Sequence, residues 1–280
     1  MVIRATLVSA AILLSSVSAA PSPGCGNSPT ITSGTYTTTI NSKEREYIVN
    51  IPENYDENNP YSLIFTFHAL GGSAEEIAEG ADGDGTRAYY GLPPFADGSA
   101  IFVSPDGLNR GWANLGGEDV EFVDDMLETL EADLCIEQDL RFATGFSYGG
   151  AMSFSLACSR PDEFRAVAVL SSAIVSGCDG GETPVAYYAQ HGTGDLVLNI
   201  GLGRQMRDQF VENNGCTPVE PEPEPGSDGS STKVEYEGCA EGYPVTWVVF
   251  DGDHTASQTD PGEDEPFAPG NTWEFFSQFM

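Results

Sequence analysis

The chain has 280 residues, 40% of them hydrophobic, which is enough to bury the core of one large domain or two small ones. Eleven lysines and arginines stand against 43 aspartates and glutamates, so the formal net charge is −32 at pH 7. Long-range repulsion then disfavours nucleic acid, anionic membranes and polyanions as partners, whereas neutral polymers and uncharged molecules remain compatible. The simpler explanation of the acidity is that it keeps the protein soluble.

The N-terminal residues predict a secretory signal peptide. Arg4 supplies a positive charge, an apolar stretch too short to span a bilayer follows, and small residues around Ala19 form a cleavage site. Cleavage one residue later would leave Pro21 at the mature N-terminus, so we expect the cut after Ala19. The sequence therefore predicts a signal peptide at residues 1–19 and a secreted, soluble chain at residues 20–280.

Six cysteines form an even set in a chain that is expected to be secreted, which predicts three disulfides. They are Cys25, Cys135, Cys158, Cys178, Cys216 and Cys239. Six cysteines allow 15 connectivities, and we favour only the pair Cys216 and Cys239, which would close an irregular loop. No cysteine or histidine spacing matches a metal site, so no metal is expected.

Hydrophobic patterning predicts strands that alternate with helices along the chain. The predicted strands are residues 45–51, 63–67, 100–103, 141–144, 166–170, 185–190 and 245–250. The predicted helices are residues 118–134, a helix that ends near residue 160, and residues 204–211 and 271–279. This alternation predicts the α/β class, with a mostly parallel central sheet and helices on both faces.

A stretch rich in proline, glutamate, glycine and serine covers residues 218–232. Such a composition cannot bury a core and predicts a solvent-exposed loop. Because a strand pattern resumes at residues 245–250, the stretch is interpreted as a loop within one domain. We therefore expect residues 20–280 to form a single catalytic domain.

The sequence Gly145-Phe146-Ser147-Tyr148-Gly149 is a G-x-S-x-G motif between a predicted strand and a predicted helix. This context is typical of a nucleophile elbow, a sharp turn that exposes the serine hydroxyl at the end of a sheet. Glycines on both sides of the serine allow the strand and helix backbones to approach closely. The motif is short enough to occur by chance in a chain with 32 glycines, so its partners must decide its meaning.

A serine hydroxyl is a weak nucleophile at neutral pH and needs a base, usually a histidine held by a carboxylate. In α/β-hydrolases the acid follows the serine and the histidine comes last. Of the three histidines, His254 fits this order because it follows the strand predicted at residues 245–250. His191 precedes the best candidate acid and is assigned a structural role. His68 precedes Ser147 and belongs to another feature.

Asp195 is the preferred acid because it follows the strand predicted at residues 185–190, in a glycine-rich loop. Asp251 and Asp253 are rivals, since they neighbour His254 in the sequence. A carboxylate adjacent to the histidine in a tight turn is poorly placed to reach its ring nitrogen. We therefore interpret both rivals as solvated turn residues.

An oxyanion hole needs two backbone N–H groups, one of them from the residue after the nucleophile. Tyr148 supplies that group. The second is expected from the H-A-L-G-G loop at residues 68–72, with Leu70 as the first candidate and Ala69 or Gly71 as alternatives. The competing interpretation is a glycine turn that only ends a strand.

Five blocks of the sequence resemble the fungal feruloyl esterases of carbohydrate esterase family 1. They are G-F-S-Y-G-G-A-M-S-F-S-L-A-C-S-R, F-H-A-L-G-G, G-W-A-N-L-G-G-E-D, A-Y-Y-A-Q-H-G-T-G-D-L-V-L and F-D-G-D-H-T. The resemblance implies a cofactor-free α/β-hydrolase that cleaves hydroxycinnamic esters, both small esters and those of plant cell-wall arabinoxylan or pectin. By motif position, the serine, acid and histidine of the family correspond to Ser147, Asp195 and His254. The stretch at residues 218–232 departs from the family pattern.

Substrate choice is less well defined by the sequence. A cinnamoyl pocket needs apolar and aromatic walls, and Trp112 is the candidate substrate contact, with a core tryptophan as the alternative. The second candidate activity is that of an acetylxylan esterase. The alternative that is not an enzyme is a secreted binding protein with an inactive hydrolase fold. The loss of a catalytic residue would indicate such a protein, and the sequence shows no such loss.

Overall fold

The computed structural model describes residues 20–80 and 87–280, so the predicted signal peptide lies outside the described residues. The strands are β1 (Gly34–Ile40), β2 (Lys43–Asn50), β3 (Tyr61–Phe67), β4 (Ala100–Pro105), β5 (Ile136–Phe146), β6 (Ala166–Leu170), β7 (Ala186–Gly192), β8 (Thr232–Glu235) and β9 (Val245–Phe250). The α-helices are α1 (Ala74–Glu79), α2 (Pro93–Ala96), α3 (Glu118–Asp133), α4 (Tyr148–Ser159), α5 (Ile200–Asn213) and α6 (Phe267–Ser277). Short 3-10 helices are η1 (Ala88–Gly91), η2 (Leu108–Arg110) and η3 (Leu115–Gly117).

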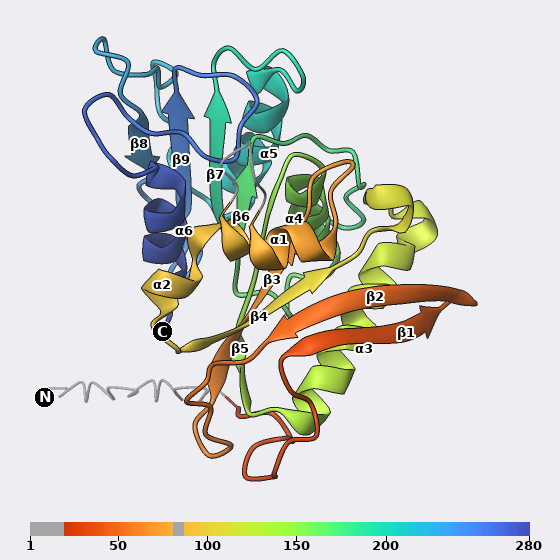
Figure 1. The fold of residues 1–280 in the computed structure, drawn as a ribbon. Coiled ribbons are helices and arrows are strands. Elements are labelled where there is room, and N and C mark those ends of the chain that lie inside the picture. The colour runs from red at the N-terminus through yellow and green to blue at the C-terminus, as the bar shows by residue number, and fades with distance from the viewer. Residues whose placement is uncertain (1–19, 81–86) are drawn as a thin grey trace, which may run out of the picture.

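All strands of the described residues join one sheet, in the order β1-β2-β4-β3-β5-β6-β7-β9-β8 (Figure 1). The strands from β4 to β9 in this order run parallel to one another. Antiparallel pairing adds β2 and β1 at one edge and β8 at the other. The sheet is therefore mostly parallel, as the alternation of predicted elements indicated.

Helices cover both faces of this sheet (Figure 1). Successive side chains of a strand point to opposite faces, so Phe65 packs in one core with Phe154 of α4, whereas its neighbour Ile64 packs in a second core with Phe276 of α6. The first core also receives α3 and α5, and the second receives α1 and α2. Burial on both faces explains why β3 is mainly apolar rather than alternating between apolar and polar residues.

The hydrophobic pattern does not predict the edge strands β1 and β8. Their residues are exposed or half-buried, so neither carries the apolar run of a central strand. A two-residue turn joins β1 to β2 at Asn41 and Ser42, whose φ angles are 51° and 64°. The last helix, α6, begins at Phe267 rather than at the predicted Asn271. Pro269 lies in its first turn, where the missing N–H has no partner in the helix.

The stretch rich in proline and glutamate is anchored to the domain. The carboxylate of Glu222 forms ion pairs with Arg204 at 3.0 Å and with Arg207 at 2.6 Å, both on α5. Pro223 is buried, and Thr232 already belongs to β8. Parts of this predicted exposed loop are therefore packed against the helix layer.

Three disulfides use all six cysteines, as the even count predicted. They join Cys25 to Cys135, Cys158 to Cys178 and Cys216 to Cys239, so the one pairing expected from the sequence is confirmed. The second ties α4 to the loop after β6. Within residues 20–80 and 87–280, none of the helices has the length and apolar character that a bilayer-spanning helix needs.

Candidate active site

The candidate site residues follow four of the five consecutive parallel strands β3, β5, β6, β7 and β9, at their carboxyl ends. The H-A-L-G-G loop follows β3, Ser147 follows β5, Asp195 follows β7 and His254 follows β9. Between β3 and β5 the chain changes the direction in which it adds strands, because β4 lies on one side of β3 and β5 on the other. Such a switch point opens a crevice at the carboxyl edge of a parallel sheet.

Ser147 lies in a backbone conformation that few residues adopt, with φ 55° and ψ −117°. The turn is held from both sides. Its N–H donates to the carbonyl of Leu170 at 2.9 Å, and the hydroxyl of Ser172 donates to its carbonyl at 2.6 Å. The surrounding structure therefore maintains a strained turn that places the serine between strand and helix.

The glycines around the serine are required by close backbone contacts. A Cβ atom on Gly145 would collide with the backbone of Gly149, and one on Gly149 would collide with the carbonyl of Phe67 at the end of β3. A Cβ on Gly150 would lie 2.8 Å from the Cβ of Ser172. The structure thus confirms the close strand and helix crossing that the G-x-S-x-G-G sequence predicts.

Ser147, His254 and Asp195 form a continuous chain of hydrogen bonds. The Oγ of Ser147 lies 2.9 Å from Nε2 of His254, and Nδ1 of His254 lies 2.7 Å from Oδ2 of Asp195. A carboxylate only accepts, so Nδ1 carries the proton and Nε2 is free to accept one from the serine. The two rival acids, Asp251 and Asp253, are exposed.

Asp195 is completely buried and its second oxygen is also satisfied. Its Oδ1 accepts the N–H groups of Val197 at 2.9 Å and Leu198 at 2.7 Å. Four donors on one carboxylate, counting His254 and, at 3.2 Å, His191, hold it in a single orientation. This fixed acceptor in turn fixes the ring of His254.

His191 lies behind Asp195. Its Nε2 is 2.7 Å from the carbonyl of Leu198 and 3.2 Å from Oδ2 of Asp195, so it donates a proton toward both oxygens. Nδ1 is buried and has no partner among the described residues. Gly203 packs so closely against this ring that a Cβ there would collide with it. The ring supports the acid from behind, which agrees with the structural role assigned to it.

Among the described residues, two backbone N–H groups of the H-A-L-G-G loop have no acceptor. The N–H of Gly71 donates to the carbonyl of Arg110 at 2.8 Å and is unavailable to a substrate. Those of Ala69 and Leu70 have no acceptor within the described part of the chain. Gly71 is therefore excluded as an oxyanion donor, whereas Leu70 and Ala69 remain candidates.

Leu70 and Tyr148 come together beside the elbow. A Cβ on Gly111 would lie 2.9 Å from the ring of Tyr148 and 3.2 Å from the side chain of Leu70, so both side chains border this glycine. Tyr148 is the first residue of α4, and an N–H at this position has no carbonyl partner within the helix. The two proposed donors therefore lie on neighbouring segments.

The substrate-contact prediction for Trp112 is corrected by the structure. Its side chain is fully buried, packs edge-on against Phe67 with 5.1 Å between ring centroids, and donates from Nε1 to the carbonyl of His68 at 2.8 Å. A side chain that is enclosed in this way cannot line a pocket. The alternative of a core tryptophan holds, because the indole both fills the core and satisfies its one donor.

Exposed apolar side chains at the carboxyl edge were not predicted as site residues. They lie on loops after β3, β4, β6 and β7 and are Leu70, Leu115, Val175, Leu196 and Val197. Leu196 is 95% exposed although it neighbours the buried Asp195. The signal that would have found them is an apolar residue in an otherwise polar or glycine-rich loop that follows a strand.

Burial lowers the pKa of His68 and of His191 below the ordinary value of about 6.5. Nearby carbonyls and carboxylates raise the pKa of each ring, but by less than burial lowers it. The unfolded chain then takes up these protons at higher pH than the folded chain. The free energy of unfolding is therefore expected to be highest above about pH 6.5 and to fall as pH drops toward the folded pKa values. Urea unfolding at pH 7 and pH 5 measures this slope.

The matched comparison is His191→Gln, which keeps a donor toward Asp195 but does not titrate. We expect its free energy of unfolding to fall less between pH 7 and pH 5 than that of the parent. Equal slopes in the two proteins would show that His191 contributes no such linkage.

The sheet order, the helices on both faces and the elbow after β5 define an α/β-hydrolase fold. Solved structures share it. A CE1 ferulic acid esterase from Anaeromyces mucronatus aligns with a TM-score of 0.59 and 18% identity, covering 88% of this chain and 89% of that chain. An acetyl xylan esterase from Aspergillus awamori aligns with a TM-score of 0.61 and 17% identity, covering 88% and 100%. At these identities the likeness concerns the fold alone.

Relatives with similar sequences identify the family, which the solved structures do not. The chain is 60% identical to feruloyl esterase D of Neurospora crassa over 265 residues, which cover 93% of this chain and 91% of the relative. It is 48% identical to feruloyl esterase C of Emericella nidulans over 261 residues, which cover 93% and 92%. No protein-family model matches the chain. At this identity and coverage, the chain belongs to the family of fungal feruloyl esterases, as its motifs implied.

Proposed function

We propose that this chain is an esterase that hydrolyses feruloyl and related hydroxycinnamoyl esters of plant cell-wall polysaccharides. Ser147 is the nucleophile, His254 the general base and Asp195 the acid that orients the base. The observation that carries this proposal is the hydrogen-bond chain Asp195–His254–Ser147, at 2.7 and 2.9 Å, in a member of the feruloyl esterase family. Family membership supports the substrate class, and the geometry supports the reaction type.

In the first half of the reaction, the Oγ of Ser147 attacks the ester carbonyl while Nε2 of His254 takes the hydroxyl proton. The negative charge of Asp195 stabilises the imidazolium that forms. The tetrahedral intermediate then collapses, the bond to the sugar oxygen breaks, and His254 returns its proton to that oxygen. The sugar hydroxyl leaves and the acyl group stays on Ser147.

In the second half, water replaces the sugar. His254 removes a proton from the water, which attacks the acyl carbonyl, and the same proton then passes to Oγ as the acid leaves. Both tetrahedral intermediates carry a negative oxygen. The N–H groups of Tyr148 and Leu70 are the donors proposed for it, because neither has an acceptor in the described part of the chain and they lie on neighbouring segments.

The exposed apolar side chains around the elbow are proposed to contact the acyl group, in place of the buried Trp112. Leu196 is the first candidate, since it is 95% exposed next to Asp195. A phenylpropenoid placed against such side chains gains about 25 cal/mol for each Å² of apolar area removed from water. This gain raises kcat/KM for cinnamates if the contact persists in the transition state.

We expect the reaction to need no metal, because none of the proposed steps uses one. Among the described residues, no group of three or more histidine, cysteine, aspartate and glutamate side chains is placed to hold a metal ion.

We also propose that the chain acts outside the cell, which the three disulfides support.

The substrate class is tested with protein that a secreting host releases into its medium. The N-terminal sequence of this protein should begin at Ala20. Methyl ferulate, caffeate, p-coumarate and sinapate are compared with acetylated xylan under one set of conditions. We expect a strong preference in kcat/KM for at least one hydroxycinnamate. Efficient release of acetate with negligible cinnamate hydrolysis would favour an acetylxylan esterase instead.

A variant pair locates the acyl contact in the same assay. Leu196→Ala should lower kcat/KM for the preferred cinnamate more than for nitrophenyl acetate, because only the larger acyl group reaches beyond the reacting carbonyl. Phe95→Ala is the control: this side chain is also exposed, but it lies on α2, before β4 and so at the amino edge of the sheet. Equal losses on both substrates would remove Leu196 from the acyl site.

A further inference from the structure

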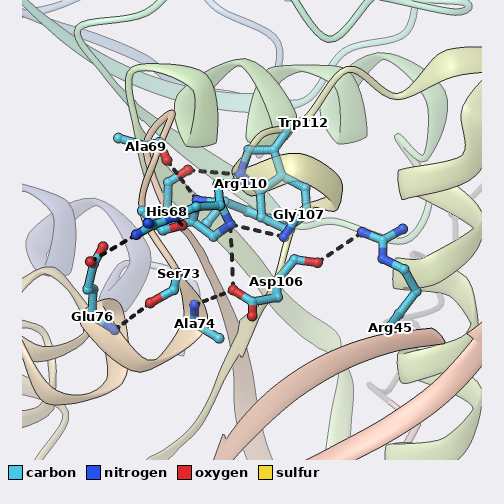
Figure 2. A network of polar contacts seen from close by, with 12 residues as sticks. Arg45, His68, Ala69, Ser73, Ala74, Glu76, Asp106, Gly107, Arg110 and Trp112 are labelled. Carbon is cyan, nitrogen blue, oxygen red and sulfur yellow. Dashed lines mark hydrogen bonds and ion pairs between the residues drawn. The ribbon is translucent and has the colours of Figure 1, made fainter. Parts of the chain in front are cut away.

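His68 joins two loops at the edge of the candidate site (Figure 2). It follows β3 directly and its side chain is buried. The backbone N–H of Gly107 donates to Nε2 at 2.9 Å, and Nδ1 lies 2.7 Å from the carbonyl oxygen of Ala69. A backbone N–H can only donate, so Nε2 carries no proton and Nδ1 must donate to Ala69. Oδ1 of Asp106 lies 3.8 Å from Nε2, beyond hydrogen-bond distance, so these two hydrogen bonds assign one neutral tautomer.

The carbonyl that His68 holds belongs to the peptide that carries the N–H of Leu70. This oxygen also accepts the N–H of Gly72 at 3.0 Å, so two donors fix its direction. In a planar trans peptide the C=O and the N–H point in opposite directions. Fixing the carbonyl of Ala69 therefore fixes the N–H of Leu70, which points away from the His68 ring and has no acceptor within the described residues.

The other side of His68 is equally constrained. Gly107 follows Asp106, whose carbonyl accepts from Arg45 at 3.0 Å and whose carboxylate accepts the N–H of Ala74 at 2.6 Å (Figure 2). The carbonyl of His68 itself accepts from Trp112 at 2.8 Å. The loop after β4 is thus a fixed support, and the imidazole transmits its position to the loop after β3.

We propose that His68 is a positioning residue for the esterase reaction, which orients the Ala69–Leu70 peptide so that the N–H of Leu70 is a preorganised donor to the oxyanion. This inference rests on the proposed function and adds a second histidine to its machinery. His68 touches no reacting atom and acts only through the peptide. Donors that are already oriented stabilise the developing charge without reorganisation during the reaction.

Two substitutions separate the contacts that His68 makes. In His68→Asn the amide nitrogen lies near the position of Nδ1 and can donate to the Ala69 carbonyl. In His68→Gln the longer side chain places an amide oxygen near the position of Nε2, where it can accept from Gly107, but it offers no donor at the Nδ1 position. The asparagine variant keeps the contact that the proposal requires, and the glutamine variant keeps the other.

We expect kcat of His68→Gln to fall about 10- to 100-fold with KM changed less than about twofold, because loss of a whole oxyanion donor costs about 100- to 1,000-fold. His68→Asn should retain kcat within about fivefold. A histidine with only a packing role would instead lower Tm in both variants and leave kcat of the folded protein unchanged. That result, or equal kcat losses in the two variants, would overturn the proposal.

Two further measurements make the test independent of the proposed substrate class and of whether the variants fold. Nitrophenyl acetate is used beside methyl ferulate, so the ratio of the two variants remains measurable even if the feruloyl substrate class is wrong. The ¹⁵N shifts of the three imidazoles in the parent protein report tautomers without any variant having to fold. We expect His68 to carry its proton on Nδ1, and a proton on Nε2 or on both nitrogens near pH 7 would contradict the proposal.

Discussion

Ser147→Ala is expected to lower kcat for every ester substrate on the order of 10⁴- to 10⁶-fold, while the protein folds as the parent does. The reason is that the hydroxyl oxygen is the atom that forms the acyl-enzyme, and alanine has no replacement for it. KM should change little, because the rest of the site stays in place. Initial rates on methyl ferulate and a thermal unfolding curve measure the two quantities.

Ser159→Ala is the matched control, since Ser159 lies at the far end of the helix that Ser147 caps and its hydroxyl donates to the carbonyl of Ser155 at 2.8 Å. It should retain the parent kcat. A serine-directed phosphonylating reagent should inactivate the parent and the control but not Ser147→Ala. Activity that survives the Ser147 substitution would refute the nucleophile assignment.

Asp195→Asn is expected to lower kcat about 10⁴-fold, the size of effect known for this change in a serine, histidine and aspartate site. The amide keeps the volume of the carboxylate and can still accept the N–H groups of Val197 and Leu198. With its oxygen turned to those N–H groups, its NH2 group faces His254, donates to Nδ1 and forces the wrong tautomer. The loss should therefore appear in kcat with a small change in Tm.

Asp253→Asn is the control for this experiment. Asp253 neighbours His254 in the sequence and was a rival for the same role, but its side chain is exposed. We expect its kcat to stay within about twofold of the parent. A large loss in Asp253→Asn together with an active Asp195→Asn would reverse the assignment of the acid.

Much of the fold was predictable because its strongest signals are local. The strands β3, β6 and β9 are mainly apolar and buried along their whole length, which is the pattern of a strand covered on both faces. The edge strands β1 and β8 were missed because one of their faces stays in solvent and the other is only half-buried. Their place depends on a partner strand, which no local pattern reveals.

The disulfides likewise include one pairing that could be predicted from the sequence and others that could not. An even number of cysteines in a chain with a predicted signal peptide indicates three bridges, because oxidation in the secretory pathway pairs them. The pair Cys216 and Cys239 is 23 residues apart and was expected. The pair Cys25 and Cys135 is 110 residues apart, and only the folded chain brings such distant residues together.

The sequence by itself determined the elbow, the order of serine, acid and histidine, and the family, because each depends on residue types at fixed spacing. Tertiary structure alone decided what surrounds these residues. It encloses Trp112 in the core, supports Asp195 with His191, and connects His68 to the peptide of Leu70. Such contacts join loops that follow different strands, and their distances depend on the strand order of the whole sheet, which spacing along one chain does not specify.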